Sequence, residues 1–270
     1  MSKNWVLLLM VTLLAVSCTE KVEDPSEANG GYAWPERHIS KLTMQDGSFI
    51  DFVWDEEHLI SVHSSTNTYQ NNTLYVTDIV DYTITYSGEK VTRVSVDKIG
   101  ITYYYHEYGD TSYDGSYVYD YVYDDKGLLI RQNDVCDGAQ TFIVNYSYAK
   151  GKIVRMSVED EKGRVFCLRG FEWSGDNISR LSADYYEVGS FSYDNHPNPM
   201  HFPFGSELFD VVRSELFDIG VEFHWNTNNI IEANGVQYHY DYDAGGHYPV
   251  RMYIEQEGEN VIVAEYEYDK

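Results

Sequence analysis

Hydrophobic and polar residues alternate with a period of two in several parts of the chain. In residues 236–242, Val and three Tyr alternate with Gln, His and Asp, and in residues 82–86 Tyr, Ile and Tyr alternate with two Thr. Residues 261–268 show a similar alternation that ends in Tyr266 and Tyr268. Successive side chains of a strand point to opposite faces of a sheet, so the pattern predicts antiparallel strands with one buried face.

The segments between these strands repeat a short motif. An aromatic residue ends one strand, a turn rich in Gly, Asn and Asp follows, and an aliphatic residue opens the next strand. The copies are Tyr86–Val91, Tyr123–Leu128, Tyr148–Ile153, Trp173–Ile178 and Trp225–Ile230, with Trp54–Leu59 as a degenerate copy. Gly and Asn suit hairpin turns because these turns require positive φ.

The motif also recurs at a constant interval. The steps from Tyr123 to Tyr148 and from Tyr148 to Trp173 are 25 residues each, the length of two strands and two turns. We therefore predict a tandem array of β-hairpins in one all-β domain over residues 35–270, forming a curled antiparallel meander or barrel-like sheet. Residues 195–220 interrupt it as an irregular or helical excursion: 195–199 are a Pro-rich break where a cis X–Pro bond can form, and 206–219 have an approximate helical spacing.

Residues 1–17 have the pattern of a bacterial signal peptide. Lys3 supplies a basic start, and residues 5–16 are apolar except for one Thr, a run too short to span a bilayer as a stable helix. Residues 15–18 resemble a bacterial lipobox, in which the cysteine receives a diacylglyceryl group, although Ala15 stands where that motif usually has Leu. We predict lipidation of Cys18; the alternative is an ordinary secretory signal with a coincidental cysteine.

Residues 18–34 are polar and acidic and contain two Gly, which predicts a flexible tether between a membrane and the domain. An acidic stretch behind the lipidated cysteine resembles the surface-export tag of Bacteroides-type lipoproteins, and that resemblance implies display at the cell surface. The predicted location is therefore the outer membrane, facing either the periplasm or the outside.

Charge narrows the classes of partner. The formal net charge is −25, which repels phosphate backbones and makes the chain unsuited to nucleic acid. The acidity itself is explained by solubility. Two cysteines remain beyond Cys18. In a simple meander, Cys136 and Cys167 lie about three strand spacings apart, roughly 14 Å, too far for a disulfide, so we predict two buried, unbridged thiols.

Motifs for chemistry are absent from the sequence. No nucleophile elbow, Walker loop, dinucleotide fingerprint, zinc spacing or complete calcium loop is present, so we assign no catalytic residue, no metal ligand and no cofactor. Carboxylates are too abundant, at 44, for any pair to mark a glycosidase. Stretches 110–114 and 134–137 are at most partial calcium sites.

Tyrosine is the unusual residue, with 26 copies, and many of them crowd residues 103–123. Strand alternation cannot bury all of these side chains, and exposed Tyr makes good contact surface. The candidate ligand contacts are Tyr103, Tyr105, Tyr113, Tyr117 and Tyr119. The alternative is cross-strand packing of the tyrosines that stiffens the sheet.

Two resemblances follow from these motifs. Residues 123–128 resemble the YD repeat of Rhs-type proteins. The lipobox, the hairpin array, residues 193–199 and residues 228–230 together resemble a family of uncharacterised Bacteroides-type lipoproteins over most of the mature chain. This resemblance implies a porin-like β fold and an envelope location, and it brings no activity, cofactor or catalytic residue.

The sequence therefore favours a non-enzymatic, lipid-anchored binding or structural protein of the envelope, with a glycan or a protein as its ligand. The alternative is a secreted, glycosidase-like hydrolase that uses a carboxylate pair in a concave pocket. A membrane pore is disfavoured, because many strands carry charged or Thr residues on the face without tyrosine, where a lipid-facing band would have to be apolar.

Overall fold

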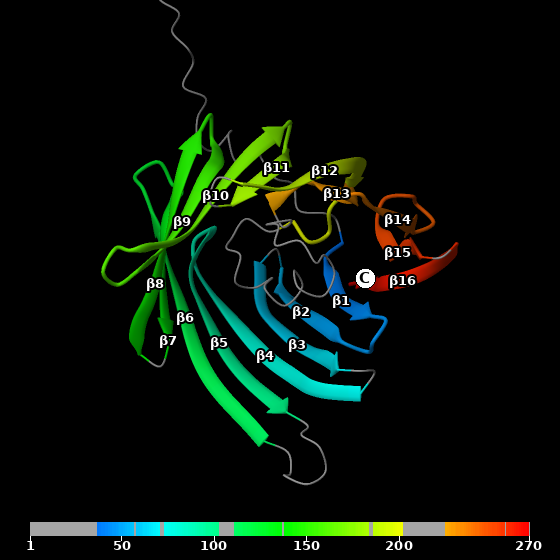
Figure 1. The fold of residues 1–270 in the computed structure, drawn as a ribbon, viewed down its shortest axis with the longest axis horizontal. Helices are drawn as coiled ribbons and strands as arrows, with labels where there is room; N and C mark the ends of the chain where they lie inside the picture. Colours follow the sequence, from blue (N-terminus) through cyan, green and yellow to red (C-terminus); the bar gives the residue numbers. More distant parts are fainter. Residues whose placement is uncertain are drawn as a thin grey trace, which may run out of the picture.

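The computed structural model describes residues 37–56, 58–70, 73–102, 111–136, 138–183, 186–201, 225–256 and 258–269. Sixteen β-strands lie in these ranges (Figure 1). They are β1 (Ile39–Met44), β2 (Phe49–Asp55), β3 (His58–Gln70), β4 (Thr73–Ser87), β5 (Lys90–Thr102), β6 (Thr111–Tyr123), β7 (Leu129–Cys136), β8 (Ala139–Ala149), β9 (Lys152–Asp160), β10 (Val165–Ser174), β11 (Asn177–Ala183), β12 (Tyr186–Pro197), β13 (Asn228–Ala233), β14 (Val236–Tyr242), β15 (Pro249–Gln256) and β16 (Glu259–Tyr268). No helix of the described residues is long and apolar enough to cross a membrane.

The strands form a closed, up-and-down antiparallel barrel. Each strand pairs with its sequence neighbours, and β1 closes the sheet by pairing with β16, with Leu42 opposite Tyr266 and Met44 opposite Ala264. The predicted all-β fold is thus confirmed, and the choice between a closed barrel and an open curled sheet is settled in favour of closure.

Closure gives the barrel two ends. The terminal rim is the end where β1 begins at Ile39 and β16 ends at Tyr268, and it carries the turns that follow even-numbered strands. The opposite rim carries the turns that follow odd-numbered strands. Five of the six turns predicted from the aromatic motif, those after β2, β4, β6, β8 and β10, are present and belong to the terminal rim. One example is the β8–β9 turn, where Lys150 and Gly151 have φ of 51° and 75° and Tyr148 pairs with Ile153.

One predicted turn is wrong. Trp225–Ile230 has the motif, but the described chain there does not join two paired strands: Trp225 precedes β13, and β13 pairs with β12 on one side and β14 on the other. The asparagines there bond to neighbouring strands instead: Asn226 accepts the Ile178 N–H, and the Asn228 amide donates to the His196 carbonyl. In the predicted break, β12 continues to Pro197 and no described peptide bond is cis, while residues 206–219 lie outside the described residues.

The barrel interior is mostly apolar, and its outer wall carries charged residues together with exposed aliphatic residues such as Ile99 and Val122. Tyr82 and Ile84 on β4 are each 5% exposed, and Val94 on β5, opposite Ile84, is fully buried. Only the inside of a single-layer barrel can bury side chains so completely. The outer wall instead carries cross-strand ion pairs at Lys41–Asp51, Arg93–Asp120, Arg180–Glu172 and Arg251–Glu265.

Candidate functional site

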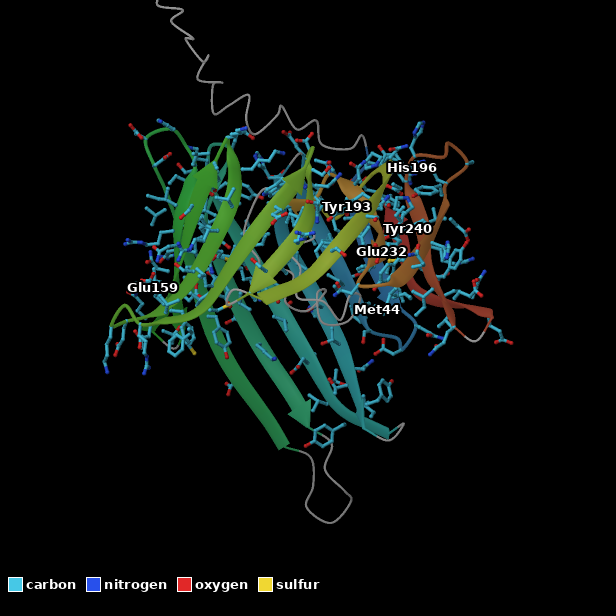
Figure 2. The ribbon with its side chains drawn as sticks, turned by 45° about the horizontal axis from the view of Figure 1, so that its top comes forward. Met44, Glu159, Tyr193, His196, Glu232 and Tyr240 are labelled. Atoms are coloured by element: carbon cyan, nitrogen blue, oxygen red, sulfur yellow. The ribbon has the colours of Figure 1, made fainter. Side chains whose placement is uncertain are left out.

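The terminal rim is tied together by one repeated hydrogen bond. The aromatic residue near the end of each even-numbered strand donates its hydroxyl or indole N–H to a backbone carbonyl at the start of the preceding strand. The eight bonds in the described residues are Trp54 to Ile39, Tyr86 to Leu59, Tyr123 to Val91, Tyr148 to Leu129, Trp173 to Ile153, Tyr193 to Ile178, Tyr240 to Ile230 and Tyr268 to Pro249. We call these eight residues the rim aromatics. Figure 2 places Tyr193 and Tyr240 at this end of the barrel and Met44 and Glu159 away from it.

Basic side chains cover several of the rim aromatics. The His38 ring stacks on Trp54 with centroids 4.2 Å apart. Lys152 lies over Trp173, with its Nζ 4.8 Å from the ring centroid. Such contacts neutralise no charge but shield the aromatic faces from water and fix the rings in place. The rim aromatics therefore hold neighbouring strands together at this rim.

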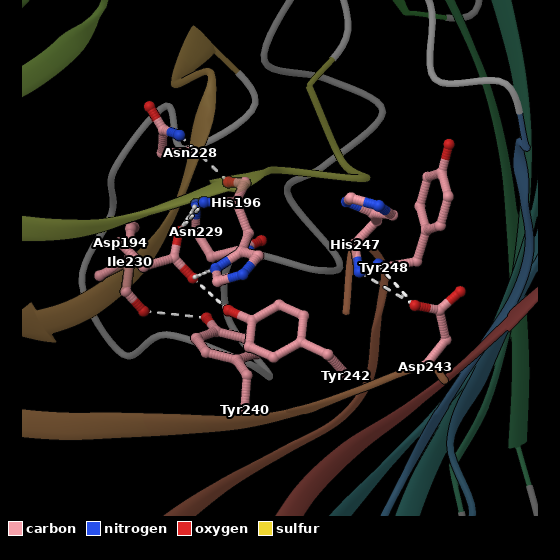
Figure 3. Close-up of polar contacts among 10 residues, drawn as sticks. All are labelled: Asp194, His196, Asn228, Asn229, Ile230, Tyr240, Tyr242, Asp243, His247 and Tyr248. Carbon is pink, nitrogen blue, oxygen red and sulfur yellow. Dashed lines mark hydrogen bonds and ion pairs between the residues drawn. The ribbon is translucent and has the colours of Figure 1, made fainter. Parts of the chain in front are cut away.

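One seam in the barrel needs additional bonds. The β13–β14 ladder consists of two residue pairs, Glu232–Gln237 and Ala233–Val236, both near the opposite rim. Toward the terminal rim the gap is bridged by the carboxylate of Asp194 on β12. Figure 3 shows how this carboxylate accepts the Tyr242 hydroxyl from β14 and the backbone and side-chain amides of Asn229 from β13, both at 3.2 Å.

His196 completes this cluster. Its backbone N–H donates to Asp194 at 2.9 Å, its ring Nδ1 lies 3.4 Å from the same carboxylate, and the ring stacks on Tyr242 with centroids 4.0 Å apart. Asp194, His196, Asn229 and Tyr242 are called the seam cluster below. Asp194 is occupied by donors on all sides, so the cluster is built to hold strands together rather than to move a proton.

The pKa values agree with a structural role for these groups. Burial raises the pKa of Tyr123 from its ordinary value of 10.0 to about 12. Burial, and then the bond to Asp194, also raises the pKa of Tyr242. Turn N–H groups, first that of Arg164, lower the pKa of Asp160, and the N–H of His247 does the same for Asp243.

A glycosidase needs two carboxyl groups with diverging pKa values across one cleft. Asp160 and Asp243 do not meet that requirement, because both pKa values are lowered and the two residues lie on opposite rims. Within the described ranges no cluster of His, Cys, Asp and Glu has metal-binding geometry. Asp110 and Asp137, from the two partial calcium stretches, lie outside those ranges.

The predicted tyrosine contacts lie on the interior wall. Tyr117 and Tyr119 on β6 share the inward face with the buried Tyr121, and they pair across the sheet with Val96 and Val94. Both are half-buried and pack against the core, as the cross-strand packing alternative predicts. Their partial exposure also means that solvent reaches this part of the interior.

Polar groups share this wall with the tyrosines. Lys98 on β5 and Asp78 on β4 alternate with buried Val residues and pair at 3.3 Å on the inward face. Gln132 is fully buried; it accepts a hydrogen bond of 3.0 Å from Tyr146 and donates one of 2.7 Å to Asp134. The interior wall therefore combines aromatic faces with a few polar groups, the combination that small-molecule sites use.

The remaining predicted residues have different outcomes. Cys18, Tyr103 and Tyr105 lie outside the described residues, as does the side chain of Tyr113 on β6. Cys136 and Cys167 are both free, as predicted, but they are half-buried and not buried, because they lie on the inward face close to the opposite rim.

Sequence reasoning missed the seam cluster and the backbone carbonyls to which the rim aromatics donate. The recurrence of an aromatic and an aliphatic residue in each hairpin was visible, but the bond joins the start of one strand to the end of the next. The sequence interval between them ranges from 10 residues for Tyr240 to 32 for Tyr123. No local motif marks a contact of such variable spacing.

No protein-family model matches the sequence, and no curated protein matches it either. Among solved structures, the chain is similar to a porin-like protein from Bacteroides uniformis, with a TM-score of 0.42 and 14% identity over 86% of this chain and 96% of that chain. It is also similar to a porin-like protein from Bacteroides vulgatus, with a TM-score of 0.41 and 12% identity over 86% of this chain and 99% of that chain. The assignment as a closed all-β barrel rests on the strand pairing itself, and the lipoprotein family and YD-type repeat stay predictions.

Proposed function

We propose that this chain is a lipid-anchored protein of the cell envelope whose barrel is a non-enzymatic binding module. The observation that carries the proposal is the distribution of charge on the barrel: the buried interior is mostly apolar, and exposed ion pairs such as Arg93–Asp120 lie on the outer wall among scattered aliphatic residues. A wall of this kind belongs in water, because a charge exposed to hydrocarbon is costly. Membrane attachment then falls to a diacylglyceryl group on Cys18.

The two rims offer different access to a ligand. The described chain begins at Arg37, beside the terminal rim. We infer that ligands enter from the opposite rim, which leads to the interior wall with Tyr117 and Tyr119. A glycan or a protein segment fits the aromatic and polar groups there.

The membrane part of the proposal is tested in cells that express a C-terminally tagged chain. Labelling with a palmitate analogue should mark the wild type and not Cys18→Ala. Proteinase K applied to intact cells distinguishes a surface-exposed barrel, whose tag is lost, from a periplasmic one, whose tag survives until lysis. Equal labelling of both forms would rule out the anchor.

The binding part is tested by affinity electrophoresis in gels that contain a set of polysaccharides, with chemical crosslinking in envelope extracts for protein partners. The double variant Tyr117→Ala/Tyr119→Ala probes the interior wall. Tyr253→Ala is the matched control, because Tyr253 stacks on His239 on the outer wall with centroids 5.3 Å apart. A wild type that is never retarded and never crosslinked contradicts a binding function.

A further inference from the structure

The opposite rim contains a notch made by unequal strand lengths. β2 begins at Phe49, opposite Ser65 of β3, whereas β3 continues to Gln70. On the other side, β16 begins at Glu259 but meets its first described β1 partner at Ala264. The short β1–β2 hairpin is therefore flanked by two longer walls whose facing edges lack a partner strand in the described residues.

A pocket of about 490 Å³ occupies this notch. Its apolar lining residues include Met44 from β1 together with Ile254 and Val263 from β15 and β16. Its polar lining residues include Asn67 and Gln256. The volume lies within the range of small-ligand pockets, and the lining mixes apolar and polar residues.

Tyr69 supplies an aromatic surface in the pocket. A β-bulge between Thr68 and Tyr69 displaces this side chain from the regular ladder, and bulges commonly redirect side chains at functional positions. The ring is 47% exposed, and its hydroxyl donates to the backbone carbonyl of Asp46 at 3.3 Å. The bond holds the hydroxyl at the pocket edge and leaves the ring accessible.

Apart from the Asp46 carboxylate, the polar side chains that line the pocket are uncharged. Asp46 accepts the backbone N–H and the hydroxyl of Ser48, both at 2.8 Å. The side chains of Gln45 and Gln256 make no hydrogen bond within the described part of the chain, so their amides are free to donate and accept. No Lys, Arg or His is among the described lining residues, and the chain carries −25 overall, so an anionic ligand is disfavoured.

We propose that this notch pocket binds a neutral pyranose unit of a glycan, with Tyr69 stacked on the apolar face of the sugar and the Gln45 and Gln256 amides bonded to its hydroxyls. A pyranose has an apolar C–H face and polar edges, the complement of this ring and its amides. The inference rests on the proposed binding function and specifies its site and ligand class. The pocket lies at the opposite rim, away from the start of the described chain.

The test is calorimetric titration of the barrel with neutral hexose hexasaccharides of α-1,4, β-1,4 and β-1,3 linkage, with a galacturonic acid hexamer as the anionic probe. Tyr69→Ala should raise the Kd for the bound neutral sugar about tenfold, the scale of a lost aromatic contact. Tyr69→Phe, which keeps the ring, should change it by less than about threefold. Val122→Ala on the outer wall of β6, remote from the pocket lining, should leave it unchanged, and thermal melts confirm that each variant is folded.

The outcomes distinguish failure of the notch proposal from failure of the proposed binding function. If Tyr69→Ala binds as the wild type does while Tyr117→Ala/Tyr119→Ala fails, the sugar sits on the interior wall; the notch proposal is overturned and the binding function stands. Preferential binding of the galacturonic acid hexamer overturns the neutral-ligand assignment. If the wild type binds none of the sugars, glycan recognition is wrong in both proposals, and a protein partner is left for the module.

Discussion

The phenol hydroxyl of Tyr148 donates a hydrogen bond of 2.9 Å to the backbone carbonyl of Leu129 in the preceding strand. The other seven rim aromatics in the described residues make equivalent hydrogen bonds at the terminal rim. Each one satisfies a carbonyl where a strand begins and packs an aromatic side chain against the core, so the hairpin repeat seen in the sequence is also a repeat of a stabilising contact.

Tyr148→Phe should lower the free energy of unfolding by about 1 kcal/mol, because it leaves the Leu129 carbonyl without its donor in a largely buried place. Urea denaturation monitored by circular dichroism measures the change. Tyr253→Phe is the control, since that hydroxyl has no hydrogen bond within the described residues. Equal midpoints for the two variants would show that the rim aromatics stabilise the barrel by packing and not by their hydrogen bonds.

The barrel should lose stability in alkali. Burial raises the pKa of Tyr123 from 10.0 to about 12, so between these values the unfolded chain has released a proton that the folded chain still holds. Stability from this group is therefore complete below pH 10 and is lost as pH rises through about 12. Burial also raises the pKa of other rim aromatics, such as Tyr86, so the loss of stability continues to higher pH.

Absorbance of tyrosinate during a pH titration measures this behaviour. Exposed tyrosines should titrate first, and the buried ones should appear together with loss of the circular dichroism signal. A smooth titration of all tyrosines near pH 10 with the fold intact would mean that the rim tyrosines are open to water.

Asp194→Asn should open the β13–β14 seam. The new amide places an N–H₂ group where the carboxylate accepts Tyr242 and Asn229, so at least one buried donor loses its acceptor, at a cost of about 1–3 kcal/mol. Thermal denaturation should show a lower midpoint. Asp241→Asn, on the outer wall with 52% side-chain exposure, is the matched control and should have little effect. Equal midpoints would mean that the ladder alone holds the seam.

Two neighbouring substitutions on β5 test which face of the wall is inside. Val94→Asp places a carboxylate in a fully buried position and should prevent folding. Ser95→Asp points to the outer wall and should be tolerated, because that wall already carries Arg93 and Asp97. Protease resistance of the two purified variants measures the result, and the reverse ranking would mean that the outer wall is the apolar one.

The sequence predicted the hairpin array well because strand alternation and turn chemistry are local. The Tyr86–Val91 and Tyr148–Ile153 turns lie where the motif places them. Alternation, however, defines two faces without saying which one is inside, so the sequence could not place the candidate contacts Tyr117 and Tyr119 on the interior wall, where they are half-buried. The notch pocket was not predictable, because it depends on how far β3 and β16 extend beyond the β1–β2 hairpin.

The most direct test of the account is the behaviour of residues 35–270 in buffer without detergent, since this segment contains all sixteen described strands. The charged outer wall predicts a folded protein that stays in the supernatant at high-speed centrifugation and produces no conductance in a planar lipid bilayer. A barrel that needs detergent to remain dispersed, or that opens channels in the bilayer, would contradict the assignment of an apolar interior and a water-facing wall.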